Sequence, residues 1–135
     1  MVISLYIPAS KQGLHNITNR VESQVQKAGF DSGLCTLFIK HTSASLIIQE
    51  NADPSAKCDL EAWLSRLVPE NDSLYTHTHE GPDDMPSHIK SILTSTSLSV
   101  PVQHGKLALG IWQGIYLWEH RHSGGEREIA IHISN

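Results

Sequence analysis

The spacing of apolar positions predicts that the chain opens with a strand followed by a short helix. The N-terminal segment MVISLYIPASKQ is typical of a strand that already belongs to the fold. Asn16 is suited to cap a helix, because its side chain can accept hydrogen bonds from the backbone N–H groups that lack a partner in the first turn. Apolar residues then recur at three- and four-residue steps from Ile17 to Ala28, and Gly29 ends the helix.

Two strands with one apolar face each follow this helix. Residues 34–40 alternate apolar and polar side chains, and a second such strand runs from Ala44 toward Glu50. Counting by two places His41 at the end of the first apolar face and Glu50 at the end of the second. We therefore expect these two polar side chains to converge where the buried strands end.

A second helix is defined by its start and by its apolar stripe. Asp53 supplies a capping carboxylate and Pro54 suits the first turn, so the helix should begin here. The stripe that we expect to be buried comprises Ala56, Leu60, Trp63, Leu64 and Leu67. The polar segment that follows, residues 70–86, is too rich in histidine and aspartate for a plain connector. It leads into a short helix that Asp83 or Asp84 should cap.

The rest of the chain is predicted to be β structure. The expected segments are a strand at residues 98–102, a turn at His104 and Gly105, a long strand from Lys106 to about Arg121, a Ser-Gly-Gly turn and a last strand at residues 129–133. Two main helices and a run of antiparallel strands indicate an α+β fold and not a doubly wound one. We expect a single domain over residues 1–135.

Length and charge narrow the class of protein. A chain of 135 residues has room for one hydrophobic core. The net charge of -4 and the scattered Lys and Arg residues argue against nucleic acid as a partner. No apolar run approaches the roughly 20 residues of a membrane span. No signal peptide is apparent, so we expect a cytoplasmic protein that does not enter a membrane.

Common catalytic motifs are absent from the sequence. It has no glycine-rich phosphate loop leading into a helix, no GxSxG and no HExxH, which argues against kinases, dehydrogenases, serine hydrolases and zinc proteases of the HExxH type. Cys35 and Cys58 have no paired spacing and are expected to be reduced thiols.

The nine histidines are the unusual feature of the composition, because histidine serves as a metal ligand or a proton carrier near neutral pH. The first group of candidates comprises His77, His79, Glu80, Asp83, Asp84 and His88. Imidazole and carboxylate groups are ligands of Zn, Mn or Fe, and three protein ligands with an open position form a catalytic geometry. The alternative is a solvated loop in which Asp84 only caps the helix.

Two further groups of polar residues lie on predicted strands. The second group comprises His41, Thr42, Ser43, Glu50 and Asn51. In the third, WQGIYLWEHRHSGG, Gln113 and Glu119 share the apolar face, while Trp118 and His120 occupy the other. Buried polar groups need partners, so Gln113 and Glu119 either form interface hydrogen bonds or line a pocket. Arg121 can hold a phosphate or carboxylate in a fork, or lie at a solvated strand end.

Three blocks of the chain resemble the signature blocks of the YjbQ family. They are HTSASLIIQENADPSAKCDLE, YTHTHEGPDDMPSHIKSILTSTSLSVPV and GKLALGIWQGIYLWEHRHSGGEREI, in this order and over nearly the whole chain. The resemblance implies a compact α+β fold with an antiparallel β-sandwich-like core, assembled as a homotrimer. Some family members are associated with thiamine-phosphate synthase activity, which joins a pyrimidine diphosphate to a thiazole phosphate with loss of pyrophosphate.

The family pattern adds weight to individual residues of this chain. They are His41, Glu50, Asn51, Asp53, Asp59, His77, Asp84, His88, Gln113, Glu119, His120 and Arg121. The family commonly has Asp directly after the first loop histidine, where this chain has Thr78. Either His79 or Glu80 takes over the role of that Asp, or the site is weaker.

We therefore expect an enzyme-like trimer with a metal site where strand ends meet the long loop. The expected ligands of the divalent metal, which is Zn, Mg or Mn, are His41, His77 and His88. Residues expected to act in catalysis are Glu50, Asp84, Glu119, His120 and Arg121, and those expected to bind substrate are Asn51, Lys90 and Gln113. The expected partner is a small phosphorylated metabolite, whose developing charge the metal and Arg121 or Lys90 would neutralise. The alternative is a non-enzymatic trimer that binds a metabolite or a metal.

Overall fold

One long strand, β6 (Gln113–Ser134), organises the fold in the computed structural model, which describes residues 1–135. β1 (Val2–Asn16) runs antiparallel to β6 along one edge for almost its whole length. On the other edge, β2 (Ser32–Ile39) pairs with the C-terminal half of β6. β3 (Ala44–Glu50) pairs with the N-terminal half. β6 is therefore shared by every part of the sheet that carries candidate residues.

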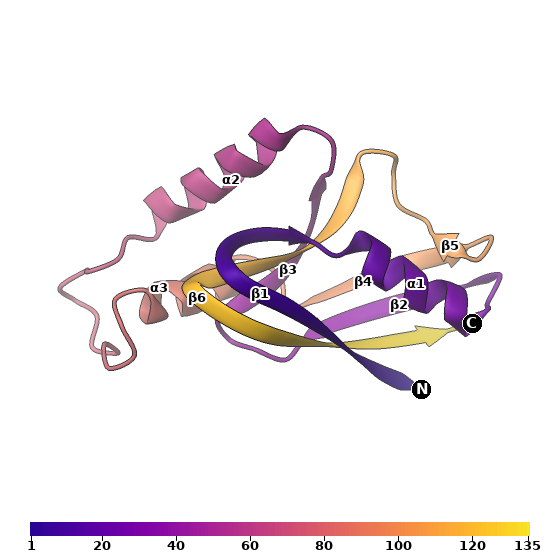
Figure 1. Ribbon diagram of the computed structural model, residues 1–135, viewed down its shortest axis with the longest axis horizontal. Helices are drawn as coiled ribbons and strands as arrows, with labels where there is room; N and C mark the ends of the chain where they lie inside the picture. Colours follow the sequence, from indigo (N-terminus) through magenta and orange to yellow (C-terminus); the bar gives the residue numbers. More distant parts are fainter.

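The remaining elements complete one curled antiparallel sheet with three helices around it (Figure 1). β4 (Ser97–Gln103) pairs with β2, and β5 (Lys106–Leu107) pairs with β4, so the order is β1-β6-β2-β4-β5 with β3 beside β6. α1 (Thr18–Ala28) follows β1, α2 (Pro54–Leu67) follows β3, and α3 (Asp84–Leu93) precedes β4. None of these helices is both long and apolar enough to cross a membrane. The predicted α+β class is confirmed, and a single curled sheet forms the sandwich-like core.

Two hydrophobic clusters lie on opposite faces of β6, as the alternation of its side chains requires. Ile115 and Leu117 are buried in the larger cluster, which α1 joins through Val21 and Val25. Trp118 belongs to the smaller cluster, to which α2 contributes. The helices therefore cover both faces of the central strand.

The end of the first helix and the strand after it confirm the sequence prediction, but the N-cap position of the helix is Ile17 and not Asn16. The Asn16 side chain accepts a hydrogen bond from the backbone N–H of Thr18 at 3.0 Å, which satisfies one unpaired donor at the helix start. Gly29 ends α1 with a φ of 77°, a left-handed conformation that favours glycine. In β2, Leu37 and Ile39 are buried on the predicted apolar face.

α2 begins as predicted, but its apolar stripe is only partly buried. The carboxylate of Asp53 accepts a hydrogen bond from the backbone N–H of Ser55 at 2.9 Å and so caps the helix. Leu64 is the one buried residue of the helix, whereas Trp63 is 54% exposed. The expectation of a buried stripe was wrong because α2 extends away from the body of the molecule (Figure 1). The rest of the chain therefore packs against only a small part of the surface of this helix.

The predicted Ser-Gly-Gly turn does not exist, because β6 runs through it as one strand. β1 stays paired with β6 on both sides of this segment. A Cβ atom on Gly124 would lie 2.3 Å from the Ala9 carbonyl oxygen and 2.3 Å from a carboxylate oxygen of Glu119. The missing side chain therefore permits a close approach between neighbouring strands, which is the other common role of a glycine inside a strand.

The long strand predicted from Lys106 to Arg121 is broken in its first half. β5 is short, and residues 110–112 form a turn before β6 begins. The Gln113 side-chain oxygen accepts a hydrogen bond from the backbone N–H of Gly110 at 2.8 Å, and the Gln113 backbone N–H donates to the Gly110 carbonyl at 3.0 Å. Gln113, which we expected to bind substrate, closes this turn.

Candidate functional site

His77, Asp84 and His88 form the candidate centre, here called the histidine–aspartate cluster, with ligand atoms that all lie within 4.8 Å of one another. Asp84 and His88 are one turn apart on α3 and project to the same side, while His77 comes from the loop before α3. The Asp84 Oδ2 atom lies 2.5 Å from His77 Nε2 and 3.3 Å from His88 Nε2. Two imidazole nitrogens and one carboxylate oxygen thus converge.

The tautomer of His88 follows from its second ring nitrogen. His88 Nδ1 lies 2.9 Å from the carbonyl oxygen of Thr42, which can only accept a hydrogen bond, so Nδ1 carries the proton. A neutral His88 then directs the lone pair of Nε2 at the carboxylate of Asp84. Two electron-rich atoms in this arrangement need a cation, either a second proton on His88 or a metal ion.

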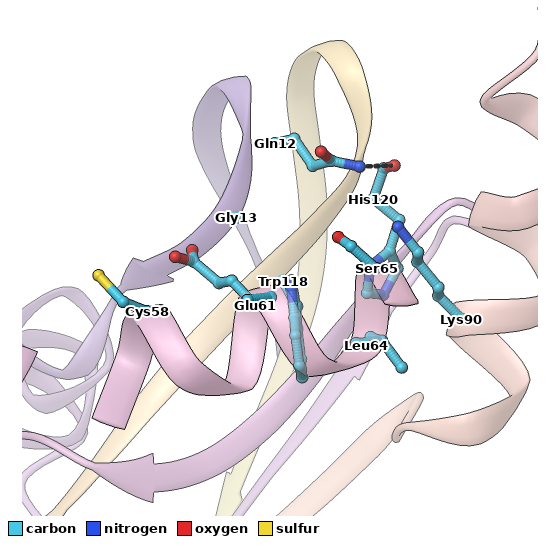
Figure 2. A pocket seen from close by; sticks show the side chains of 10 residues that line it. Gln12, Gly13, Cys58, Glu61, Leu64, Ser65, Lys90, Trp118 and His120 are labelled. Atoms are coloured by element: carbon cyan, nitrogen blue, oxygen red, sulfur yellow. Dashed lines mark hydrogen bonds between the residues drawn. The ribbon is translucent and has the colours of Figure 1, made fainter. Parts of the chain in front are cut away.

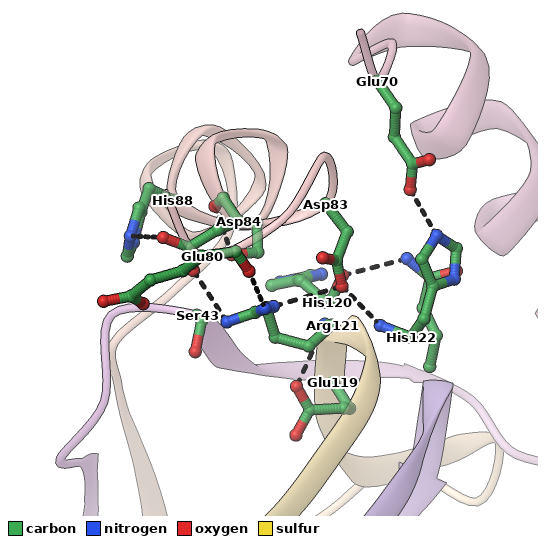
Figure 3. Close-up of polar contacts among 12 residues, drawn as sticks. Ser43, Glu70, Glu80, Asp83, Asp84, His88, Glu119, His120, Arg121 and His122 are labelled. Carbon is green, nitrogen blue, oxygen red and sulfur yellow. Dashed lines mark hydrogen bonds and ion pairs between the residues drawn. The ribbon is translucent and has the colours of Figure 1, made fainter. Parts of the chain in front are cut away.

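Arg121 holds the carboxylate of Asp84 in place. Asp84 is 2% exposed, and its Oδ1 accepts a hydrogen bond from Arg121 Nη1 at 2.9 Å. Arg121 Nε donates to Asp83 at 3.1 Å and Nη2 donates to the Glu80 carbonyl at 2.7 Å, so the guanidinium lies across both aspartates (Figure 3). The hydrogen bond to Asp83 raises the pKa of Arg121 above its ordinary value. Arg121 thus engages the protein itself through each of its three guanidinium nitrogens.

Asp83 fastens the start of α3 to β6. Burial alone would raise the pKa of Asp83, but hydrogen bonds from the His122 backbone N–H at 2.8 Å and from Arg121 outweigh it, so the pKa is lowered. The His122 side chain in turn hydrogen-bonds to Glu70, at the beginning of the polar loop. Asp83 is therefore an ionised anchor and not a proton donor.

His41 lies outside the histidine–aspartate cluster. His41 Nε2 accepts a hydrogen bond from the backbone N–H of Glu128 at 2.8 Å, so this nitrogen is not free to bind a metal. Burial, followed by the nearby charge of Arg127, lowers the pKa of His41. The arrangement brings two of the three expected metal ligands together and places Asp84, which we expected to act in catalysis, in the third position.

Glu119 forms a buried ion pair that the sequence analysis missed. Arg127 donates two hydrogen bonds to its carboxylate, from Nε at 2.6 Å and from Nη2 at 2.7 Å, and Glu119 is fully buried. Arg127 Nη2 also donates to the Ser43 hydroxyl at 3.0 Å, and the backbone N–H of Arg121 donates to Glu119 at 3.1 Å. Glu119 thus ties together Arg121 and Arg127, two separate positions of β6. A glutamate on an apolar face requires a cationic partner, and that requirement was the available signal for Arg127.

His120 and Lys90 are buried together on the outer face of β6. Burial, with the nearby charges of Lys90 and Arg127, lowers the pKa of His120 to about 3, so its ring is neutral at pH 7. Burial also lowers the pKa of Lys90, although Glu70 and Asp83 oppose this effect. Lys90 and His120 line a pocket to which none of His77, Asp84 and His88 contributes.

The other predicted residues lie far from the cluster. Glu50 pairs with Gln113 at the N-terminal end of β6, whereas His41 precedes the opposite end of β3, about 20 Å away along the strand. The expected convergence of His41 and Glu50 therefore does not occur, because they lie at opposite ends of one strand. The Asn51 side chain donates hydrogen bonds to the carbonyl oxygens of Ile111 and Gln113 and so fixes the turn before β6.

The donor set of the cluster fits Zn or Mn better than Mg. Imidazole nitrogen suits Zn and Fe, and the carboxylate also suits Mn, whereas Mg prefers a shell of oxygen ligands and retains water. The side chain of His77 is 49% exposed, so an outside ligand can approach the cluster from that side. Asp84 is fixed through its second oxygen, which is the kind of support that metal ligands in proteins receive.

Comparison with other sequences identifies the family. The chain matches the YjbQ family model, described as UPF0047 protein YjbQ-like, over residues 3–135. A UPF0047 protein from Synechocystis is 50% identical over 130 residues, which cover 96% of this chain and 88% of that protein. The UPF0047 protein YjbQ of Escherichia coli O157:H7 is 45% identical over 127 residues, which cover 93% of this chain and 91% of that protein.

Solved structures share the same fold. An uncharacterized conserved protein of the YjbQ/UPF0047 family from Clostridium acetobutylicum superposes with a TM-score of 0.88 at 33% identity, covering 98% of this chain and 99% of that one. A conserved hypothetical protein from Thermus thermophilus gives a TM-score of 0.87 at 34% identity, with coverage of 98% and 99%. By sequence and by fold, the chain belongs to the YjbQ (UPF0047) family.

Proposed function

We propose that this protein is a metal-dependent enzyme that acts on a small phosphorylated metabolite at the histidine–aspartate cluster. The supporting observation is that His77 Nε2, Asp84 Oδ2 and His88 Nε2 converge, with the His88 tautomer already set for ligation. Three protein ligands with an open position are typical of catalytic metal sites. A plain solvated loop accounts less well for the cluster, because Asp84 is almost completely buried.

The balance of charge favours an anionic ligand at this site. Asp83 and Asp84 contribute two negative charges, and Arg121 returns one positive charge. A divalent ion would add two more, so these three side chains and the ion would together carry one positive charge, which the nearby Glu80 carboxylate partly offsets. A phosphate or diphosphate oxygen is a ligand that such a site attracts.

Thiamine-phosphate synthesis is the specific reaction that we propose, because the family resemblance implies it. In this reaction the carbon–oxygen bond between the pyrimidine methylene carbon and its diphosphate breaks, and the thiazole nitrogen takes the place of the diphosphate. The bonding electrons leave with the diphosphate, so negative charge develops there. A divalent ion in the cluster would neutralise that charge. The residues of this chain hold the ligand atoms in place through Arg121 and Thr42.

A non-enzymatic protein that binds a metal or metabolite is the second candidate. The observation in its favour is that His41 and Glu119 are both engaged by Arg127 and not by the cluster. The cluster therefore has few acid–base groups beyond its own histidines. A binder should take up metal or ligand to saturation and turn over no phosphorylated substrate.

We also propose a homotrimer as the assembly of this chain. Large apolar side chains are exposed on α2, on α3 and in the turn before β6, and they are Trp63, Leu67, Ile92, Leu93, Ile111 and Trp112. Contiguous exposed apolar patches are more typical of protein interfaces than of surface that stays in water. Contacts between copies of the chain would cover these side chains.

Pyrophosphate release from a pyrimidine diphosphate and a thiazole phosphate tests the enzymatic proposal. Metal-loaded wild-type protein should release pyrophosphate, and His88→Ala should lose this activity while keeping its melting temperature. His79→Ala is the matched control, since His79 lies in the same loop but outside the cluster, and should behave as wild type. Saturable metal uptake without pyrophosphate release would instead support the binding protein.

A further inference from the structure

A pocket between α2 and β6 encloses about 390 Å³, and none of the three residues of the histidine–aspartate cluster lines it. Figure 2 shows Cys58 and Glu61 at one end of this pocket, and Lys90 and His120 at the other. Trp118 forms part of the wall between the two ends. The pocket is large enough for a small organic molecule.

Two polar groups at the Lys90 end have no hydrogen-bond partner in the chain. His120 is 1% exposed, and its Nδ1 is the one buried side-chain nitrogen or oxygen that lacks a hydrogen bond. Lys90 is 5% exposed, and the nearby carboxylates of Glu70 and Asp83 do not form an ion pair with it. Buried polar groups are nearly always hydrogen-bonded, so the unpaired Nδ1 of His120, beside a Lys90 ammonium that no carboxylate pairs with, indicates a missing ligand.

The positions of the protons in a short hydrogen-bond chain determine whether His120 Nδ1 is a donor or an acceptor. The chain begins at the Lys90 carbonyl, which lies 2.8 Å from the Thr94 hydroxyl. The Thr94 hydroxyl lies 2.6 Å from the Ser45 hydroxyl, and the Ser45 hydroxyl lies 2.8 Å from His120 Nε2. A carbonyl has no proton to give, so Thr94 donates to Lys90 and Ser45 donates to Thr94. His120 Nε2 must then donate to Ser45. In a neutral ring this leaves Nδ1 as a bare acceptor.

We propose that this pocket binds a small oxyanion that carries a neighbouring hydroxyl group. The carboxylate or phosphate oxygen accepts a hydrogen bond from the Lys90 ammonium, and the hydroxyl donates to His120 Nδ1. Trp118 and Leu64 line the pocket and offer apolar surface to the carbon skeleton. This site is independent of the metal, so it does not require the function proposed for the histidine–aspartate cluster.

Imidazole nitrogen NMR of chelator-treated protein, with calorimetry alongside, tests the site with four simple probes. Glycolate represents the hydroxylated carboxylates, glycerol 3-phosphate represents the hydroxylated phosphates, and acetate and inorganic phosphate are the counterparts without a carbon-bound hydroxyl. We expect at least one hydroxylated probe to bind to saturation and to shift the His120 Nδ1 signal. It should bind about tenfold more tightly than its counterpart, because a buried acceptor discriminates strongly against a ligand without a donor. The probe that binds identifies the source of the oxyanion.

Two variants complete the test. Lys90→Met removes the ammonium but keeps the length of the side chain, and should weaken binding at least tenfold. Ser65→Tyr fills the pocket from the exposed side of α2 without touching the core. It should also weaken binding at least tenfold, and it provides the test if Lys90→Met folds poorly. Lys106→Met, on β5, is the control and should bind as wild type. The proposal is overturned if no probe shifts the His120 signal, or if Ser65→Tyr binds the probe as tightly as wild type does.

Discussion

Arg121 binds Asp84 through one carboxylate oxygen and leaves the other to two histidines. Arg121 Nη1 lies 2.9 Å from Asp84 Oδ1, while Oδ2 faces His77 and His88. The ion pair between Arg121 and Asp84 therefore has two effects: it joins β6 to α3, and it orients the proposed ligand atom. In this way the sheet supports a cluster whose three members all come from a loop and a helix.

Arg121→Met should lower the metal affinity of the cluster about 10- to 100-fold, although it removes none of the proposed ligands. Asp84 would lose the partner that orients it, and the buried charge of Asp83 would lose a hydrogen bond as well. Competition with a chromophoric chelator measures the affinity. Arg66→Met, on the exposed side of α2, is the control. Unchanged affinity in Arg121→Met would show that Arg121 does not position the ligand.

Arg127→Met should destabilise the protein by about 3–5 kcal/mol, because it leaves the fully buried carboxylate of Glu119 without its charged partner. Denaturant unfolding measures the change. The double variant Glu119→Met with Arg127→Met should recover much of the loss, because no unpaired buried charge remains. Additive losses in the double variant would contradict the pairing.

The free energy of unfolding should fall as the pH drops from 6.5 toward 3, in part because of His120. Its pKa is lowered from an ordinary 6.5 to about 3, so over this range the unfolded chain binds a proton that the folded chain does not. The full shift is worth on the order of 5 kcal/mol, all of it retained above pH 6.5 and lost progressively below. His120→Phe should show a shallower dependence in denaturant unfolding across this pH range. His132→Gln, an exposed histidine, should keep the wild-type slope.

Trp63→Glu and Trp112→Glu should shift the assembly toward monomers, because each places a charge on apolar surface that we propose lies between copies. Light scattering after size-exclusion chromatography gives the mass directly. Wild type should elute as a trimer of 14.9 kDa chains, and Arg20→Glu, on α1, should remain trimeric. A monomeric wild type would remove the trimer from the proposal.

Much of the fold could be predicted from local sequence signals. The Asp53 cap, the end of α1 at Gly29 and the apolar face of β2 all depend on neighbouring residues, and all are confirmed. The course of β6 through Gly124 could not be predicted in this way. Gly124 lies against Ala9 of β1, which is distant in sequence, so no local pattern separates this close approach from a turn.

For the candidate site as well, the residues that are close in the sequence could be predicted, and those that strand pairing positions could not. His77, Asp84 and His88 are close in the sequence, and the spacing of four on α3 already placed two of them on one side. His41 lies outside the cluster because it comes just after β2, whose pairing with β6 places it beside Glu128 and Arg127. Such pairings depend on which strands become neighbours, and composition does not reveal this.

Metal content of untagged protein is the most direct test of the proposed metal site. Wild type should contain about one Zn or Mn per chain, and His77→Ala, Asp84→Asn and His88→Ala should each lose it. His41→Ala should keep the metal, because His41 Nε2 is engaged by the Glu128 backbone, and His79→Ala should keep it as well. Metal-free wild-type protein that stays folded and binds no added Zn or Mn would contradict the account. It would leave the cluster as a hydrogen-bonded anchor at the start of α3.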